Sequence, residues 1–419
     1  MSHAHVVLHP AARAQVSTGL PRPRPQAAAH RITSDIEAIR IARELAAQFA
    51  EQAIERDRDQ RLPIAELDRF SQSGLWAITV PKEWGGPGLG YRTVVEVVRT
   101  IAEVDPSLAQ IPQNHFCLID AIRSDGSQAQ QERFFAQVLQ GIRFGNAFSE
   151  AGSRTVTEFQ TTLTEDGDGY RVNGRKFYAT GALLAHIVPV LAVDAEKRGH
   201  LAFLDRNAPG LTVIDDWSSF GQRTTASGTV ILENVFVPRS DVVPAHLAFE
   251  RPTAAGPISQ IIQAAIDAGI ARGTIADTIW FVRNHSRPWT DSGKEQAADD
   301  PFTIQAMGDL QLRLHAAEAL LRRAARAVDH AAAAPDEDSV TAASLAVAGA
   351  KALTTEIAVL ATNKLFELAG TRSTLARHGL DRHWRNARVH TLHDPVRWKY
   401  FHIGNHALNG IRPPRHPWL

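Results

Sequence analysis

The chain is poor in the features that define several classes of protein. Among its 419 residues there is a single cysteine, Cys117, which excludes an intramolecular disulfide framework and a zinc site built from several thiolates. Neither sign of charge is in excess, with 45 Lys and Arg against 45 Asp and Glu, so a basic nucleic-acid-binding surface is not expected. No apolar run approaches the length of about 18 residues that a membrane span needs, and no apolar signal-peptide core follows Met1. The single cysteine favours a reducing cytoplasm.

The hydrophobic periodicity divides the chain into helical, β and helical parts. Pro21–Pro25 alternates proline with arginine, which blocks a helix and favours a flexible arm. Ser34 and Glu37 form a helix-capping pattern, and helical spacing follows it. Turn signals at Asp166–Gly169 and Asn173-Gly174 separate short period-two runs. The predicted parts are a flexible tail at 1–33, a helical domain at 34–145, a β domain at 146–246, a helical bundle at 247–410 and a tail at 411–419.

The densest group of chemically active residues lies near the C-terminus. His390, His393 and Asp394 fall within one short segment, and the two histidines are three positions apart, so one helical turn would place them on one face. Histidine is the side chain best suited to proton transfer near neutral pH. A metal site on these residues is a weaker interpretation, because the spacing is nonspecific and no companion ligand cluster stands out. Packing at a helix end is the structural alternative.

Four further features have a functional and a structural interpretation. The loop Gly145–Ser153 is small and polar enough to admit a flat ligand or an anion, or it connects two domains. Arg283 and Arg372 are suited to a phosphate, or to surface ion pairs. Trp217 lines a pocket or covers the β core. No Walker loop and no Gly-x-Gly-x-x-Gly after a strand is present, so a Rossmann site is unsupported.

Two segments of the β region carry a resemblance to a known family. Phe220–Thr229, followed by Glu233–Pro238, is similar to the signature of the acyl-CoA dehydrogenase superfamily, and Val172–Gly181 is similar to its flavin-facing strand. The resemblance covers about Ile36 to Gly410. It implies an α+β fold with an N-terminal helical domain, a central β domain built as a small barrel or sandwich, and a C-terminal four-helix bundle.

Two departures from the superfamily pattern narrow the resemblance. Where many acyl-CoA dehydrogenases carry a catalytic glutamate, this chain has Asp394 beside a proline. Of the superfamily's Arg-x-Gln-Phe-Gly motif at the FAD adenylate, only Arg283 is present, which favours FMN over FAD. Pro112–Phe116, Asn146–Glu150 and Thr391–Pro395 instead resemble the flavin-dependent monooxygenase branch, which includes the dibenzothiophene monooxygenases and the sulfur-acquisition oxidoreductases of the SfnB type.

The resemblance implies a role for each matching residue. The catalytic candidates are His393, His390, Asn146, Thr180 and His115. The cofactor-binding candidates are Ser149, Tyr178, Thr180, Arg283 and Arg372. The candidates for the substrate pocket are Trp217, Phe148 and His115, and no metal is expected.

The implied activity is that of a two-component monooxygenase. A separate NAD(P)H:FMN reductase would supply reduced FMN, dioxygen would form a C4a-hydroperoxyflavin, and a small organosulfur compound (a sulfide, sulfoxide or sulfone) would be oxygenated for sulfur acquisition. A homotetramer is expected, with no nucleic-acid or membrane partner. The first alternative is an acyl-CoA dehydrogenase with FAD and Glu250 as its base, and the second is a non-catalytic flavin carrier.

Overall fold

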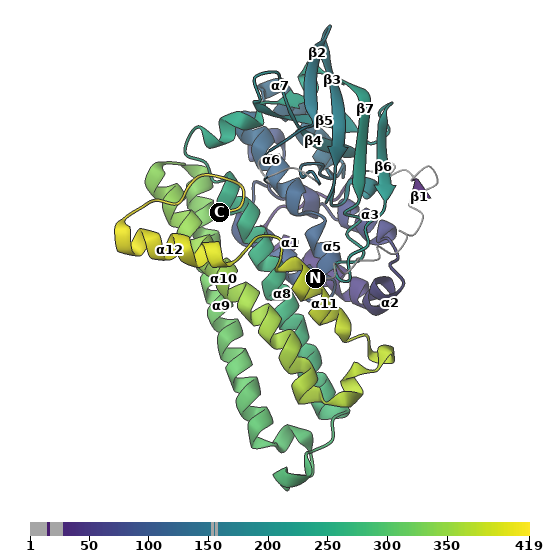
Figure 1. Cartoon of the computed structure of the whole chain (residues 1–419), viewed down its shortest axis with the longest axis vertical. Coiled ribbons are helices and arrows are strands. Elements are labelled where there is room, and N and C mark those ends of the chain that lie inside the picture. The colour runs from purple at the N-terminus through teal and green to yellow at the C-terminus, as the bar shows by residue number, and fades with distance from the viewer. Residues whose placement is uncertain (1–14, 17–27, 152–154, 156–157) are drawn as a thin grey trace, which may run out of the picture.

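The computed structural model describes residues 15–16, 28–151, 155 and 158–419. In Figure 1 the N-terminal helices and the sheet occupy the upper part of the molecule, and long helices run from there to the bottom. The N-terminal helices are α1 (Asp35–Ala50), α2 (Ala53–Arg58), α3 (Ile64–Gln72), α4 (Tyr91–Ala102), α5 (Pro106–Gln110), α6 (Gln113–Asp125) and α7 (Gln128–Leu139).

The N-terminal helices form where capping residues precede an apolar stripe. Ser34 accepts a hydrogen bond from the Glu37 amide at 3.2 Å and so caps α1, as its sequence pattern predicts. The packed part of the chain begins before the predicted boundary at residue 34, because Ala29 and Ile32 are already buried. The two residues of β1 (Gln15–Val16), which fall within the predicted tail, pair with a strand of the sheet.

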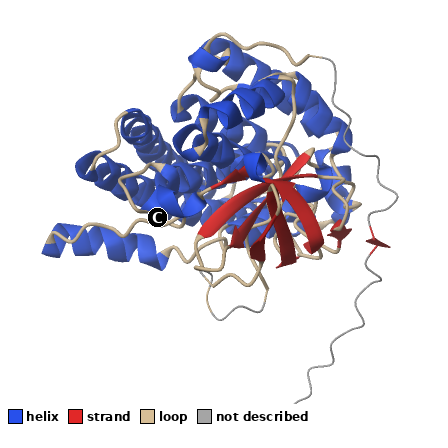
Figure 2. Cartoon of the chain, turned by 90° about the horizontal axis from the view of Figure 1, so that it is seen from above, coloured by secondary structure: helices blue, strands red, loops and turns tan. Residues whose placement is uncertain are grey.

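The β region forms one continuous sheet. Its strands after β1 are β2 (Thr162–Asp166), β3 (Gly169–Lys176), β4 (Ile187–Val193), β5 (Gly199–Asp205), β6 (Leu211–Asp215), β7 (Thr229–Pro238) and β8 (Val242–Val243). The order across the sheet is β1-β6-β7-β3-β2-β4-β5-β8, and only the β2–β4 pair is parallel. Figure 2 shows the strands fanning out beside the helices. Within the described residues no strand pair joins β1 to β8, so this is an open, twisted sheet rather than a closed barrel.

One predicted turn is instead a strand interior. Asn173-Gly174 lies within β3, where the pairing with β7 shifts register between Val172 and Gly174. A Cβ on Gly174 would collide with Thr161, so close backbone approach, and not a hairpin turn, requires glycine here. The hairpin between β2 and β3 turns at Asp166–Gly169, as predicted.

The C-terminal part is a bundle of long helices. Its helices are α8 (Ala255–Asn284), α9 (Pro301–Ala333), α10 (Glu337–Ala369), α11 (Asp381–His390) and α12 (Arg397–Asn409). In the part of the chain that is described, α10 is the one helix long and apolar enough to cross a membrane, but 61% of its most apolar stretch is buried. That burial is typical of the core helix of a bundle, and α10 packs against both α8 and α9.

Candidate active site

The end of α11 places a histidine inside the bundle, against a buried ion pair. His390 Nδ1 lies 2.5 Å from Asp267 Oδ1 of α8, and Lys351 Nζ of α10 lies 2.7 Å from Asp267 Oδ2. Thr355 donates a further hydrogen bond to Asp267 at 2.9 Å. Burial raises the pKa of Asp267, but Lys351 and His390 outweigh it and bring the pKa down to about 2. This aspartate is therefore a fixed negative charge beneath His390.

A glutamine joins this buried group to the second histidine. Gln263 Oε1 lies 2.6 Å from His390 Nε2, and Gln263 Nε2 lies 3.3 Å from His393 Nε2. The His393 side chain is 33% exposed, so it alone among these residues reaches solvent. Its Nδ1 faces Asp394 Oδ1 at 3.7 Å, and Asp394 pairs with Lys399 at 3.0 Å. The predicted histidine pair thus ends in one open imidazole.

A row of hydroxyl groups lies on the sheet side of the site. Thr180 Oγ1 is 2.8 Å from Ser227 Oγ, which is 2.7 Å from Thr225 Oγ1. Thr225 and the indole of Trp217 both donate to the carbonyl of Gln222, at 3.0 and 2.8 Å. The structure therefore connects Trp217 and Thr180, two of the predicted site residues, through a single loop.

Hydrogen bonds join the loop that carries Thr225 and Ser227 to α11, the helix that ends at His390. The Gln222 amide donates to Asn386 Oδ1 of α11 at 2.7 Å. Arg385, also on α11, donates to the carbonyl of Phe220 at 3.0 Å. Gly221 lies so close to α11 that a Cβ there would collide with the Arg385 carbonyl. These contacts hold the sheet loop and the helix that ends at His390 in fixed relation.

Strained backbone lies on this loop and at Tyr178, in the segment that follows β3. Tyr178, Gln222 and Ala226 have φ values of 55°, 51° and 49°, a region that non-glycine residues rarely adopt. The Gln222 side chain is buried, and both of its amide atoms lack a hydrogen-bond partner among the described residues. Strain and an unpaired buried amide each cost stability, and such costs are concentrated at functional sites.

An aromatic wall and a buried ion pair border the loop. Tyr178 is 55% exposed, and its ring meets Trp217 edge to face with centroids 5.9 Å apart. Asn146 is buried and donates to the Thr180 carbonyl at 3.4 Å, so these two residues also come together. Lys176 binds Glu150 at 2.6 Å and the carbonyl of Phe148 at 3.1 Å.

Ser149 and Phe148 lie beside the segment that follows β3. Ser149 is exposed, and its carbonyl accepts a hydrogen bond from the amide of Phe177 at 3.0 Å. Phe148 is half-buried. The structure thus places the Asn146–Glu150 segment directly beside the strand that leads to Thr180.

His115 does not fit the role that its sequence context predicts. It is fully buried, with its Nε2 2.9 Å from the carbonyl of Trp76 and its Nδ1 accepting from the amide of Phe144 at 3.1 Å. Burial lowers its pKa to about 3. Both nitrogens are taken by the main chain and the ring stays neutral, so His115 joins the helical domain to the sheet instead of exchanging protons.

The two predicted phosphate arginines lie away from the histidines. Arg283 is exposed in the last turn of α8, twenty residues beyond Gln263, or about 30 Å at 1.5 Å per residue. Arg372 is also exposed and donates to the carbonyl of His285, at the same helix end, at 3.1 Å. That end of α8 lies at the bottom of Figure 1, away from the sheet. Within one chain the two arginines lie near the same end of α8, and both are far from His390 and His393.

Comparison with known proteins agrees with this geometry. The family model of the acyl-CoA dehydrogenase N-terminal domain matches residues 36–142, that of the middle domain 146–235 and that of the C-terminal domain 261–398. The chain belongs to the acyl-CoA dehydrogenase family. The predicted family and its α+β architecture are thereby confirmed.

Within this family the chain is similar to several oxygenases. Dibenzothiophene monooxygenase of Rhodococcus erythropolis is 37% identical over 93% of this chain and 98% of that protein. A probable FMNH2-dependent monooxygenase, SfnC, of Pseudomonas putida is 34% identical over 90% and 96%. The structure of FMN-bound TdsC from Paenibacillus sp. A11-2 superposes with a TM-score of 0.87 at 32% identity, covering 91% of this chain and all of that one.

Three residues of the candidate site are not predicted from the sequence. Gln263, Asp267 and Lys351 lie in long helices whose apolar faces suggest only packing. The available signal was the spacing of Gln260, Gln263 and Asp267, which puts polar groups on one side of an otherwise apolar stretch. Such buried polar residues require partners, and here the partners are the histidines and Lys399.

Two further sequence features do not join the site. Cys117 is half-buried, and burial raises its pKa to about 12, so it is an unreactive thiol. Glu250 is exposed, and its neighbour Arg251 pairs with Asp125 at 2.5 Å. Within the described part of the chain, no three His, Cys, Asp or Glu side chains form a metal-binding group.

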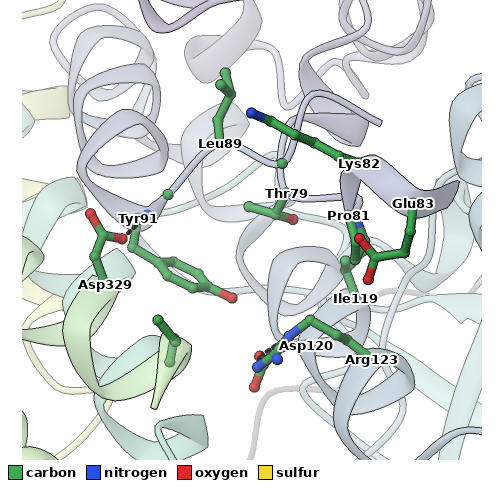
Figure 3. Close-up of a pocket in the computed structure, with 14 residues that line it drawn as sticks. Thr79, Pro81, Lys82, Glu83, Leu89, Tyr91, Ile119, Asp120, Arg123 and Asp329 are labelled. Carbon is green, nitrogen blue, oxygen red and sulfur yellow. Dashed lines mark hydrogen bonds and ion pairs between the residues drawn. The ribbon is translucent and has the colours of Figure 1, made fainter. Parts of the chain in front are cut away.

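A separate cavity of about 380 Å³ opens between α4, α6 and the end of α9. Figure 3 shows the Tyr91 ring directed into it, with Asp120 and Arg123 on its far side. Asp120 Oδ1 and Arg123 are 2.6 Å apart, and Asp329 accepts from the main-chain amide of Tyr91 at 2.5 Å. None of the predicted site residues lines this cavity.

Proposed function

We propose that the chain is the oxygenase of a two-component FMN system. It takes reduced FMN from a separate NAD(P)H:FMN reductase and uses dioxygen to oxygenate a small organosulfur compound in sulfur acquisition. The observation that carries this proposal is His393, an open imidazole backed by Gln263, His390 and Asp267. Its relatives named as dibenzothiophene monooxygenase and FMNH2-dependent monooxygenase give the substrate class and the cofactor.

The side chains on the sheet side fit a flavin ring. Tyr178 and Trp217 offer an exposed aromatic edge, and Thr180 offers a hydroxyl beside them. The unpartnered amide of Gln222 adds an unused donor and acceptor in the same loop. FMN, when bound, supplies the electrons that activate dioxygen. Ser149 and Tyr178 would hold the ring from the strand side.

The protein residues then orient the reactants and manage a proton. His393 holds or releases a proton at its imidazole, and His390 supports it through Gln263. Thr180 and Asn146 orient the flavin edge by hydrogen bonds. Trp217 and Phe148 would exclude water from the bound flavin, which would protect its reduced form from wasteful reaction. His115 contributes only by fixing the loop at Phe144.

A second copy of the chain would complete the cofactor site. Arg283 lies about 30 Å along α8 from Gln263, a distance that the short ribityl chain of FMN does not bridge. The partner subunit's Arg283 and the partner subunit's Arg372 would therefore hold the FMN phosphate, with their guanidinium groups exposed for that purpose. A homotetramer satisfies this requirement with every site shared between two copies. A reduced flavin and a lone thiol suit the cytoplasm.

The dehydrogenase alternative lacks a poised carboxylate. Glu250 is exposed on a short helical turn, and Asp394 is buried in an ion pair with Lys399. Although burial opposes it, His393, Lys351 and Lys399 hold the pKa of Asp394 below its usual value, so it is a weak base. The site thus favours FMN-dependent oxygenation over proton abstraction from an acyl-CoA.

Anaerobic mixing followed by oxygen tests the proposal. The purified protein is mixed with reduced FMN and dibenzothiophene, dimethyl sulfide or dimethyl sulfone, and oxygen-18 gas is then admitted. Mass spectrometry should find the label in a sulfur product only when protein, reduced FMN and substrate are all present. Unlabelled products with every compound would overturn the proposal, and anaerobic reduction of bound FAD by an acyl-CoA would establish the dehydrogenase.

A further inference from the structure

Gln263 occupies an unusual position for a buried amide. It lies on α8, is fully buried, and makes its two side-chain contacts with ring nitrogens, His390 Nε2 at 2.6 Å and His393 Nε2 at 3.3 Å. An amide has one accepting oxygen and one donating NH2 group, so it cannot serve two identical partners in the same way. The protonation of one ring therefore restricts the protonation of the other.

The two orientations of the amide define two states. When His390 carries a proton on Nε2, that N–H donates a hydrogen bond to the amide oxygen, and the NH2 group donates to an unprotonated Nε2 of His393. When the amide is reversed, its NH2 group donates to His390, and its oxygen accepts a hydrogen bond from the Nε2–H of His393. Placing protons on both Nε2 atoms leaves the amide with two donors facing it, which costs a hydrogen bond inside the protein.

A buried charge cluster of Asp267, Lys351 and His390 biases the choice between these states. Burial lowers the pKa of His390; Asp267, 2.5 Å away, favours the protonated ring but does not outweigh burial, and Lys351, 2.7 Å from the other carboxylate oxygen, opposes protonation. All three side chains are buried, so their charges act with little screening. The His390 ring therefore responds to the cluster rather than to solvent.

We propose that Gln263 is a positioning residue that couples the protonation of His393 to this buried charge cluster. The open histidine then gains or loses its proton together with a reorientation of the amide and a change at His390. The inference rests on the proposed function only for its purpose, which is to ready His393 for proton transfer. The other charges facing His393 are Asp394 at 3.7 Å and, through it, Lys399 of α12.

The coupling can be measured on the flavin-free protein. Diethyl pyrocarbonate carbethoxylates unprotonated imidazole, and peptide mass spectrometry follows the rate at His393 as a function of pH. Gln263→Glu keeps the shape of the side chain but replaces the donor by a second acceptor. The pH midpoint for His393 should rise by about one unit or more, because a carboxylate within hydrogen-bond distance favours the protonated ring. This carboxylate acts on His393 directly, so the rise shows that position 263 contacts the ring, and the remote variant decides whether the buried cluster is coupled to it.

A remote variant provides the second test. Thr355→Val removes one hydrogen bond to Asp267 and touches neither His393 nor Gln263. Asp267 should then hold the His390 proton more firmly, and the His393 midpoint should fall by about half a unit. In the Gln263→Leu background the same substitution should have no effect on the midpoint. Gln130→Leu, which removes a buried amide that binds β8 and the residues before it, is the matched control.

The outcomes separate this proposal from the proposed function. A rise of the midpoint in folded Gln263→Glu protein, together with a fall in folded Thr355→Val protein, supports the coupling. Unchanged midpoints overturn it, even if oxygen-18 incorporation still depends on His393. Shifted midpoints together with unlabelled products leave the coupling established and overturn the proposed oxygenation.

Discussion

The molecule holds histidines in two contrasting ways. His115, in the helical domain, is enclosed by rings and binds only main-chain groups, the Trp76 carbonyl and the Phe144 amide. His390 and His393, at the end of the bundle, bind side chains that carry charge or can reorient. A main-chain partner offers one fixed donor or acceptor, whereas the Gln263 amide can turn either its oxygen or its NH2 group toward an imidazole. The partner, and not the residue type or its burial, separates a structural histidine from a candidate catalyst.

Of the predicted effects, the largest is the loss of oxygenated product when His393, the exposed histidine, is removed. His393→Ala should lower oxygenated product by about 1,000-fold, the scale of general acid–base catalysis, while the folded state is nearly unaffected. Product yield per reduced FMN is the measurement. His402→Ala, at another partly exposed histidine, is the control. A near-normal yield from His393→Ala would mean that His390 and His393, like His115, have a structural role only.

Removing the enclosed histidine should act on stability instead. His115→Leu leaves the Trp76 carbonyl and the Phe144 amide buried without partners, which should cost about 3 kcal/mol of unfolding free energy. Urea denaturation measures the loss. Protein that remains folded should keep its oxygenation within a few-fold. A stable variant with a large loss of product would return His115 to the catalytic group.

Arg283, at the far end of α8, tests whether cofactor binding can be separated from the chemistry at the histidines. Arg283→Ala should weaken reduced-FMN binding about tenfold, through loss of a charged hydrogen bond to phosphate, without changing the oligomeric state. Anaerobic fluorescence titration and size-exclusion chromatography give the two readouts. The exposed neighbour Arg287 provides the matched variant Arg287→Ala. Equal affinity of the two variants would remove Arg283 from the phosphate site.

The pH dependence of stability tests the same contrast through the pKa of His115. The folded pKa of His115, about 3, lies below the unfolded value of about 6.5, so its contribution is complete above pH 6.5 and is lost as pH falls toward 3. In that window the unfolding free energy should fall by about 1.4 kcal/mol per pH unit on account of this residue. Urea midpoints at pH 7, 6 and 5 should show a shallower decline in His115→Leu than in the natural sequence. Parallel declines would mean that His115 is protonated in the folded state.

The sequence predicts the fold, which is confirmed, and it predicts His393 as a candidate for proton transfer, but it does not reveal the residues behind that histidine. The motifs from Val172 to Gly181 and from Phe220 to Pro238 identify the family, because they hold the turns and strands that shape its β domain. His393 stands out because few residue types transfer protons near neutral pH. Lys351 and Asp267 do not stand out, since their meaning depends on contacts between α8 and α10 that spacing along one helix cannot reveal.

The misassigned residue has an equally physical explanation. Pro112–Phe116 resembles the monooxygenase pattern, and a similar pattern is retained whether a histidine meets substrate or holds the domains together. Only the identity of both hydrogen-bond partners distinguishes the two for His115, because His390 is also buried. Arg283 and Arg372 show a different limit, because the proposal that they complete a site on a second copy cannot be read from the sequence of one.

The contact at Gly221 sets a boundary on redesign of this enzyme. Any side chain at that position would push α11 off the sheet loop and move both ends of the site at once, because Arg385 and Gln222 lie on either side of it. If the proposed function holds, efforts to admit bulkier sulfur compounds should vary Phe148 and Trp217, the proposed pocket residues, whose side chains are half-buried. A methyl group at Gly221 would instead be expected to change the acceptance of every substrate together.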